Sequence, residues 1–273
     1  MDSYLKIWGS RGGVPASGPE FNEMGHATIC IELSLPSQTV IFDAGSGLAP
    51  LGEHIVSKEQ SPPITLLIGH YHVDHLMGLP FFRPIYSDQF QVTCHLPNLA
   101  GGRGRESLDR FFAPPLFPVR LDAVSSTVKF KEFNPGENFP LGEGLQCRTM
   151  LLEHPGGNTG YRVYNHSVDV TVMTDVENIH PEPFAQLIKF AKGTRYLLLD
   201  SSYSSEQIKT KRGWGHLSVD DVGQIASQLP TTTILMVHHD VMKPDAQVKL
   251  DAARVLRAHS NLVLCKETES YYF

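Results

Sequence analysis

Short apolar runs recur along the chain between turn-forming residues, and they predict strands. In the first half they cover 4–8, 28–33, 39–42, 64–68, 91–96 and 128–133. In the second half they cover 145–152, 161–164, 168–173, 196–200, 233–237 and 262–265. Helical spacing is found at 48–57, 184–191 and 246–258, and a capping pattern opens a further helix at Ser218. This alternation predicts an α/β fold with two packed mixed sheets and helices outside.

A cluster of histidines and one aspartate directly follows the apolar run 64–68. It consists of His70, His72, Asp74 and His75. On an extended backbone the first two side chains point the same way, because they are two residues apart. Neutral imidazoles and carboxylates suit zinc, manganese or iron, and two divergent pairs on one short loop exceed what one ion needs. We therefore expect two adjacent divalent metal ions, with a solvated polar loop as the alternative.

Composition limits the classes of protein that the chain can belong to. Its 273 residues are 41% hydrophobic and 19% charged, and no Gly-, Ser- or Pro-rich linker divides them, so one globular domain over 1–273 is expected. The net charge of −6 argues against a broad basic face for long nucleic acid. A small phosphorylated substrate stays compatible, because two bound metals would add about four positive charges.

The chain carries no sign of a membrane or of export. There is no apolar run long enough for a transmembrane helix, and the N-terminus lacks the pattern of a signal peptide. The four cysteines have no CxxC spacing and are interpreted as free thiols. We expect a cytoplasmic protein without membrane contact, in an oligomeric state that the sequence leaves open, a homodimer included.

The string His70-x-His72-x-Asp74-His75 resembles the signature of the metallo-β-lactamase superfamily. The resemblance covers most of the chain, because successive predicted strand ends supply Asp43, His154, Asp175, His216 and His238. It implies a four-layer αββα sandwich and a hydrolase. It implies that His70, His72 and His154 bind one metal and that Asp74, His75 and His238 bind the other. Asp175 would bridge the two metals. It also implies a bridging water or hydroxide as the nucleophile, with Asp74 and His216 as catalytic residues.

Two of these assignments have alternatives. Strand alternation does not decide between His238 and His239, and the resemblance selects His238 because the superfamily places its last ligand directly after this strand. Asp43 either orients a metal-ligating histidine or forms a turn beside Gly45. The glycine-rich segment 9–15 has no GK[ST] pattern and is expected to be structural, with Arg11 as a candidate charge near the metals.

His216, in the string 215–218, resembles a further histidine of the phosphodiesterase branch, which includes ribonuclease Z and certain bacterial cyclic-nucleotide phosphodiesterases. The resemblance implies a general acid for the leaving oxygen, and the alternative is hydrogen bonding at a helix start. The strings 8–12, 42–45, 113–119, 154–157 and 212–216 are similar to one bacterial subgroup of predicted cyclic-nucleotide phosphodiesterases. That subgroup often has GGNT where this chain has Gly25-His26-Ala27-Thr28. Glyoxalase-type thiolesterases typically have a threonine before the metal motif, where this chain has Gly69.

Residues 98–119 combine a basic, glycine-rich stretch with aromatic residues and prolines. A long segment of this kind is expected to face the substrate. Arg103 and Arg105 would then contact a phosphate, and aromatic rings would stack on a base. The alternative is a surface excursion that packs its own aromatic side chains.

The resemblance implies a dinuclear metal-dependent phosphodiesterase, with zinc, manganese or iron, that hydrolyses a small cyclic nucleotide similar to cAMP. A small substrate is favoured over tRNA by the acidic net charge and by the lack of a long basic, glycine-rich insertion. The missing export signal disfavours a β-lactamase. The alternatives are a ribonuclease Z-like nuclease, a thiolesterase, a lactonase, and a non-catalytic metal- or ligand-binding module.

Overall fold

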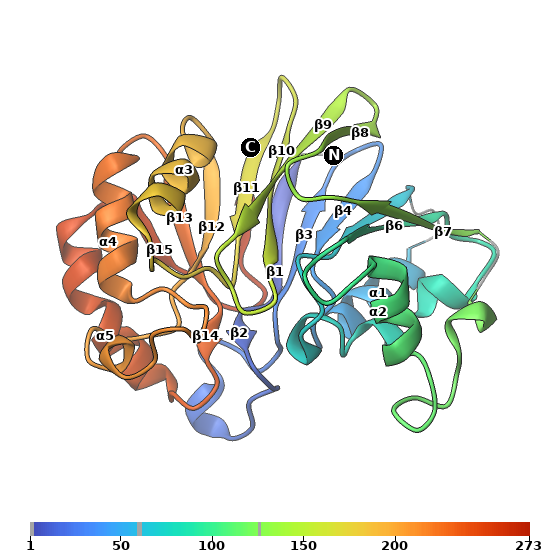
Figure 1. The fold of residues 1–273 in the computed structure, drawn as a ribbon, viewed down its shortest axis with the longest axis horizontal. Coiled ribbons are helices and arrows are strands. Elements are labelled where there is room, and N and C mark those ends of the chain that lie inside the picture. The colour runs from blue at the N-terminus through green and yellow to red at the C-terminus, as the bar shows by residue number, and fades with distance from the viewer. Residues whose placement is uncertain (1–2, 59–61, 125–126) are drawn as a thin grey trace.

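The structure is a computed structural model that describes residues 3–58, 62–124 and 127–273. Its centre contains two large β-sheets packed face to face (Figure 1). The first has the order β16 (Ser270–Tyr272), β1 (Tyr4–Gly9), β3 (Cys30–Ser34), β4 (Thr39–Phe42), β5 (Ile64–Leu67), β6 (Val92–Pro97) and β7 (Val128–Phe133). Pairing is antiparallel from β16 to β4 and parallel from β4 to β7, so this sheet is mixed.

The second sheet is mixed as well. Its order is β15 (Leu262–Leu264), β13 (Thr233–Val237), β12 (Tyr196–Asp200), β11 (Asp169–Met173), β10 (Asn158–Tyr164), β9 (Leu145–Leu152) and β8 (Asn138–Gly142). The pairs from β15 to β11 are parallel, and those from β11 to β8 are antiparallel. A short parallel pair, β2 (Arg11–Gly12) with β14 (His239–Asp240), joins the two halves of the chain.

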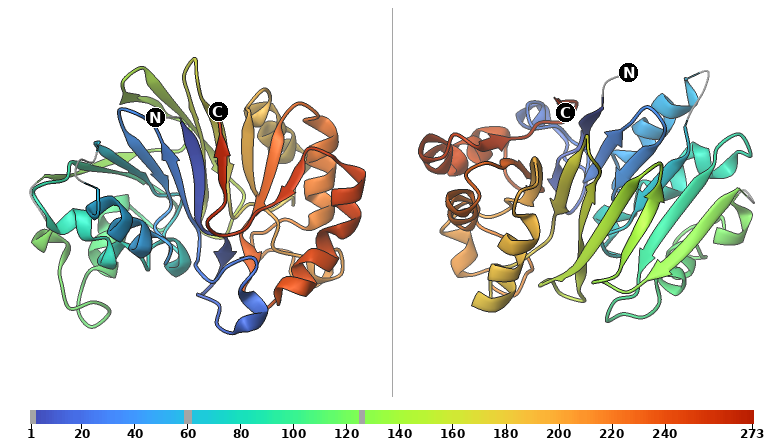
Figure 2. Two further views of the ribbon diagram at one scale, coloured as in Figure 1. Left: turned by 180° about the vertical axis from the view of Figure 1, so that it is seen from behind. Right: turned by 90° about the horizontal axis from the view of Figure 1, so that it is seen from above.

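Helices cover the outer faces of both sheets (Figures 1 and 2). On the first sheet lie α1 (Leu48–Val56) and α2 (Gly104–Phe111), and on the second lie α3 (Pro181–Ala191), α4 (Val219–Gln228) and α5 (Asp245–Ala258). The predicted αββα sandwich with two mixed sheets is therefore confirmed. Among the described residues, no helix combines the length and the apolar character needed to cross a bilayer.

The central strands β4, β5, β12 and β13 are apolar on both faces, because the sheets are covered on both sides there. In β12, Leu198 packs between the sheets with Phe42, whereas Leu197 and Leu199 pack under the helices. In β4, Phe42 faces the same central core, and Ile41 faces α1. The continuous apolar runs of the sequence are thus the mark of strands buried on both faces.

The expected elements occur close to their predicted positions, and four strands and one helix were not expected. The capping pattern at Ser218 is present, since the Ser218 hydroxyl accepts from the backbone N–H of Asp221 and the Asp221 carboxylate accepts from that of Ser218. The strands without a prediction are β2, β8, β14 and β16, which are short or half-exposed. Segment 98–119, expected to be a substrate-facing loop, contains α2. This helix was not predicted because glycines precede it and it has few apolar residues.

Candidate metal centre and active site

The site lies where the carboxyl ends of parallel strands from both sheets meet. Asp43 follows β4, the 70–75 cluster follows β5, Asp175 follows β11, and His238 follows β13. Asp43, Asp175 and His238 each have a positive φ, of 61°, 53° and 60°. This conformation costs a non-glycine residue roughly 1–3 kcal/mol and tends to occur at functional sites. Here it marks the three points at which the chain turns at the end of a strand beside the site.

One group of side chains gathers around one carboxylate oxygen of Asp175. The Nε2 atoms of His70 and His154 lie 3.6 Å and 3.7 Å from Oδ2 of Asp175. Nδ1 of His72 lies 3.1 Å from Nε2 of His154. The four side chains thus present three imidazole nitrogens and one oxygen to a common point, which is the donor set of a divalent metal.

A second group gathers around the other oxygen of Asp175. The Nε2 atoms of His75 and His238 lie 3.2 Å and 2.9 Å from Oδ1 of Asp175. Oδ2 of Asp74 lies 3.5 Å from Nε2 of His75 and 3.4 Å from Nε2 of His238. The structure therefore brings together all seven residues that the sequence suggested as metal ligands, in the two expected sets.

Both groups fit a divalent cation. In each, the candidate ligand atoms all lie within 4.8 Å of one another. Several of these atoms are buried without a hydrogen-bond partner among the described residues: Nε2 of His70, of His75 and of His238, and Oδ1 of Asp175. Leaving buried polar atoms unsatisfied costs roughly 1–3 kcal/mol each. Two bound ions would remove this cost, and nitrogen with carboxylate oxygen suits zinc, manganese or iron.

The two groups differ in their electrostatics. Burial lowers the pKa of His70 well below its usual value and that of His154 to about 4, so both are neutral imidazoles. Burial also acts to lower the pKa of His238, but the adjacent Asp175 carboxylate outweighs it and raises the pKa to about 10. The second group therefore attracts positive charge more strongly, as expected of a site with two carboxylates.

Contacts outside the two groups orient the imidazoles. Oδ2 of Asp43 lies 3.0 Å from Nδ1 of His75, and its Oδ1 accepts the N–H of Gly69 at 2.8 Å. Of the two interpretations of Asp43, orientation of a histidine is the one that this geometry supports. A Cβ on Gly69 would lie 2.7 Å from Oδ1 of Asn158, which explains why this position carries no side chain.

His154 is oriented by the segment that carries His216. Its Nδ1–H donates to the carbonyl of Gly215 at 2.9 Å, which leaves Nε2 to face Asp175. The carboxylate of Glu177 accepts the N–H groups of Gly213 and Gly215, at 2.7 Å and 2.8 Å. Glu177 thus holds the turn that supports His154.

The glycine-rich segment near the N-terminus contacts the second group directly. The N–H of Gly13 donates to Oδ2 of Asp74 at 2.7 Å. Arg11 is fully buried, and its guanidinium bonds Asp245 at 2.5 Å and the carbonyl of Lys243 at 3.1 Å. The structural interpretation of this segment is supported, and Arg11 acts by joining it to the turn after His238.

His216 lies beside both groups and is held by Asp200. Its Nδ1 is 2.7 Å from Oδ2 of Asp200, an oxygen that also accepts the N–H of Asp175 at 3.1 Å. The His216 ring stacks on that of His238, with centroids 5.0 Å apart. Burial acts to lower the pKa of His216, and the Asp200 charge outweighs it, so the pKa is raised.

Sequence reasoning missed Asp200. The signal that could have revealed it is its position at the end of the apolar run 196–200, because Asp43 and Asp175 also follow strands of this kind. Asn158 was missed too: its amide donates to the carbonyls of Thr174 and Asp175, at 2.6 Å and 3.0 Å. No pattern in the sequence marks an asparagine at the start of a strand for this role.

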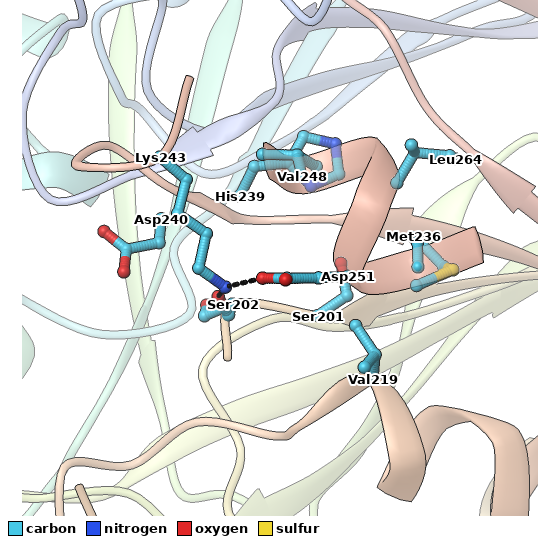
Figure 3. A pocket seen from close by; sticks show the side chains of 11 residues that line it. Ser201, Ser202, Val219, Met236, His239, Asp240, Lys243, Val248, Asp251 and Leu264 are labelled. Atoms are coloured by element: carbon cyan, nitrogen blue, oxygen red, sulfur yellow. Dashed lines mark hydrogen bonds and ion pairs between the residues drawn. The ribbon is translucent and has the colours of Figure 1, made fainter. Parts of the chain in front are cut away.

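His239, the alternative to His238, points away from the metal groups. Its Nε2 lies 2.9 Å from the carbonyl oxygen of Cys265. It lines a separate cavity of about 10 Å³ with Lys243 and Asp251, whose ammonium and carboxylate are 2.8 Å apart (Figure 3). This is room for about one water molecule. His238 is therefore the residue that the structure places with the ligands.

A larger cavity, of about 290 Å³, adjoins the first metal group. His70 and His72 form part of its wall, and segment 98–119 contributes Leu99, Gly101, Gly102, Ser107 and Arg110. The two arginines suggested from the sequence are not in this wall. Arg103 pairs with Glu132, and Arg105 lies over the ring of Phe130 at 4.4 Å. Arg110, on α2, is the arginine that the structure places in this wall.

Comparisons with known proteins agree with this geometry. The model of the beta-lactamase superfamily domain matches residues 38–239, whereas no curated protein matches the sequence. Among solved structures, the metallo-beta-lactamase fold protein YhfI from Bacillus subtilis has a TM-score of 0.73 and 16% identity, over 99% of this chain and 100% of that chain. A diphosphatase from the PhnP family has a TM-score of 0.72 and 16% identity, over 100% and 98%. Yeast PDE1 has a TM-score of 0.70 and 15% identity, over 100% of both chains. At these identities the structural similarities show the fold alone.

Proposed function

The chain belongs to the metallo-β-lactamase superfamily, and from this premise we propose that it is a dinuclear metal-dependent phosphodiesterase. Its substrate is a small phosphodiester, with a cyclic nucleotide similar to cAMP as the first candidate. Zinc is the first metal to test, followed by manganese and iron, because histidine and aspartate donors accept all three.

The observation that carries the proposal is the division of Asp175 between two sets of donors. Its Oδ2 faces His70 and His154, and its Oδ1 faces His75 and His238. One carboxylate placed in this way can bridge two ions. Two bound divalent ions supply Lewis acidity, a water of lowered pKa and a clamp for the displaced oxygens.

The residues outside the donor sets support an ester with a poor leaving group. Asp200 accepts the proton on Nδ1 of His216, so Nε2 is the atom available for proton transfer. A leaving alkoxide needs a proton in the transition state, and a positioned imidazole supplies it with a typical gain of 10²–10⁴ in rate. A thiolate leaves without such help, so this pair favours phosphoester over thioester cleavage.

The size and charge of the chain favour a small substrate. The cavity beside His70 and His72 holds about 290 Å³, near the lower end of the roughly 300–1000 Å³ usual for ligand pockets. The net charge of −6 disfavours a long polyanion. The similarity to the structure of a diphosphatase adds a phosphorus-centred reaction as precedent for this fold.

The proposal is tested with protein loaded separately with zinc, manganese or iron. Metal content and hydrolysis of 3′,5′-cyclic AMP, 2′,3′-cyclic AMP and bis(p-nitrophenyl) phosphate are measured on the same samples. Two metals per chain with turnover of a cyclic nucleotide is the expected result. Cleavage of the model diester alone would reject the cyclic nucleotide. Two metals without any phosphodiester cleavage would reject the reaction class and lead to thioester and lactone substrates.

A further inference from the structure

We infer that Arg110 binds a second anionic group of the substrate, distinct from the phosphoester that is cleaved. The preferred substrate is then a cyclic nucleotide that carries a further phosphate, such as a 5′-phosphorylated nucleoside 2′,3′-cyclic phosphate. This inference rests on the proposed function and defines its substrate class more narrowly.

The first support is the position of Arg110 and its lack of a protein partner. Arg110 lies near the end of α2 and is the one lysine or arginine among the described residues that line the 290 Å³ cavity. It has no hydrogen-bond or ion-pair partner within the described parts of the chain, in contrast to Arg103 and Arg105, which bond Glu132 and Asp109. Its charge is therefore available to a ligand.

The second support is electrostatic. The same cavity is lined by His70 and His72, which belong to the first metal group. A guanidinium that shares a cavity with bound divalent cations is repelled by them unless negative charge lies between. A scissile phosphate at the metals supplies part of this charge, and a second phosphate nearer Arg110 would form the paired, charge-assisted contacts that arginine makes with such groups.

The rest of the wall suits the body of a nucleoside. Tyr71, Leu99 and Pro155 supply apolar surface, and the Tyr71 hydroxyl is already committed to the carbonyl of Pro97 at 2.8 Å. A Cβ on Gly101 would meet no atom within 4 Å, so this side of the cavity is open. A flat, mostly apolar group therefore suits this wall. The remaining hydroxyl, on Ser107, bonds the carbonyl of Arg103 at 3.2 Å.

The test measures binding, so it does not depend on turnover. Titration calorimetry on the metal-loaded protein compares adenosine 3′,5′-bisphosphate with adenosine 3′-monophosphate. The expected result is about tenfold tighter binding of the bisphosphate, the gain of one charge-assisted contact. Arg110→Gln is expected to remove this preference and Arg110→Lys to keep part of it. Arg120→Gln is the matched control: it removes the same charge from an exposed position outside the cavity wall and should keep the preference.

A second variant tests whether the nucleotide occupies this cavity at all. Gly101→Phe places a ring in the open side and should weaken binding of both nucleotides. Unchanged binding in Gly101→Phe, or an unchanged preference in Arg110→Gln, would overturn the inference. A wild-type protein that cleaves phosphodiesters but binds both nucleotides equally would also overturn it and leave the proposed function standing. A bisphosphate preference without any phosphodiester cleavage would instead reject the proposed reaction and keep Arg110 as an anion contact.

Discussion

The backbone of Gly12 lies so close to the imidazole of His238 that an added Cβ would come within 2.0 Å of its Cε1 atom. The next residue, Gly13, donates its N–H to Asp74. Two ligands of the second metal group are thus positioned by a segment more than sixty residues away from either in the sequence. Close approach, rather than an unusual backbone conformation, is what requires glycine at position 12.

Gly12→Ala is therefore expected to displace His238 and to weaken the second metal site while the first stays filled. Loss of a supporting contact around a metal ligand typically lowers affinity 10–100-fold. The measurement is metal per chain after dialysis against buffers of graded free zinc. Gly101→Ala is the control, because its Cβ would meet nothing within 4 Å. Retention of both ions with unchanged affinity in Gly12→Ala would contradict the role given to this contact.

In the buried Arg11–Asp245 ion pair, loss of one partner should lower the free energy of unfolding more than loss of both. Arg11 is fully buried, so Arg11→Met leaves the Asp245 carboxylate without its cation and is expected to lower the free energy of unfolding by about 3–5 kcal/mol. The double variant with Asp245→Leu should recover much of this loss. Urea denaturation of the two single variants and the double variant gives the coupling, and strictly additive losses would show that the two side chains act independently.

Asp175 should contribute to the binding affinity of both metal ions, whereas each of the other six candidate ligands should contribute to one. Asp175→Asn is expected to weaken both ions, because each oxygen faces a different donor set. His72→Ala should weaken the first ion and His238→Ala the second. Calorimetric titration of metal-free protein resolves the two events. Unchanged affinity for either ion in Asp175→Asn would show that this ion does not share the Asp175 carboxylate.

His216→Gln should slow reactions in proportion to how poor the leaving group is. Substrates with alkoxide leaving groups are expected to lose about 10²–10⁴ in kcat, whereas p-nitrophenyl esters, which leave without a proton, should lose far less. Rates on a series of aryl and alkyl phosphodiesters give this dependence. Equal losses across the series would assign His216 to structure or binding. Asp200→Asn should show a weaker form of the same pattern, because it removes the partner of Nδ1.

His95 should make the fold sensitive to acid. Burial in its stack on Phe139 lowers the pKa of this imidazole to about 4. In the unfolded chain the pKa is about 6.5, so the unfolded state takes up the proton first. Stability that is present above pH 6.5 is therefore lost as the pH falls toward 4, by about 3 kcal/mol at most. Denaturation between pH 7 and 4.5 should show a smaller loss for His95→Gln than for the wild type. Parallel losses in the two proteins would remove His95 as the cause.

The sequence by itself determined the sandwich and most of the metal ligands. The apolar runs 39–42, 64–68, 196–200 and 233–237 are strands buried on both faces, a property that each run carries locally, so their positions were predicted closely. His70, His72, Asp74 and His75 share one short loop, so their spacing alone predicted a metal site. The resemblance supplied Asp175 and His238, which follow the parallel strands β11 and β13, and His154, which follows the antiparallel strand β9.

Only the tertiary structure decided between neighbours whose surroundings come from distant parts of the chain. His238 faces Asp175 and His239 faces Cys265, a choice made by a turn with positive φ that strand periodicity does not encode. The role of Asp200 is identified by its contact with His216, which lies sixteen residues away in the sequence. Arg110 lines the cavity and Arg103 and Arg105 do not, because the faces of α2 are set by its packing on β6 and β7. The local sequence pattern specifies which segments form strands and helices, whereas long-range packing specifies where each polar side chain points.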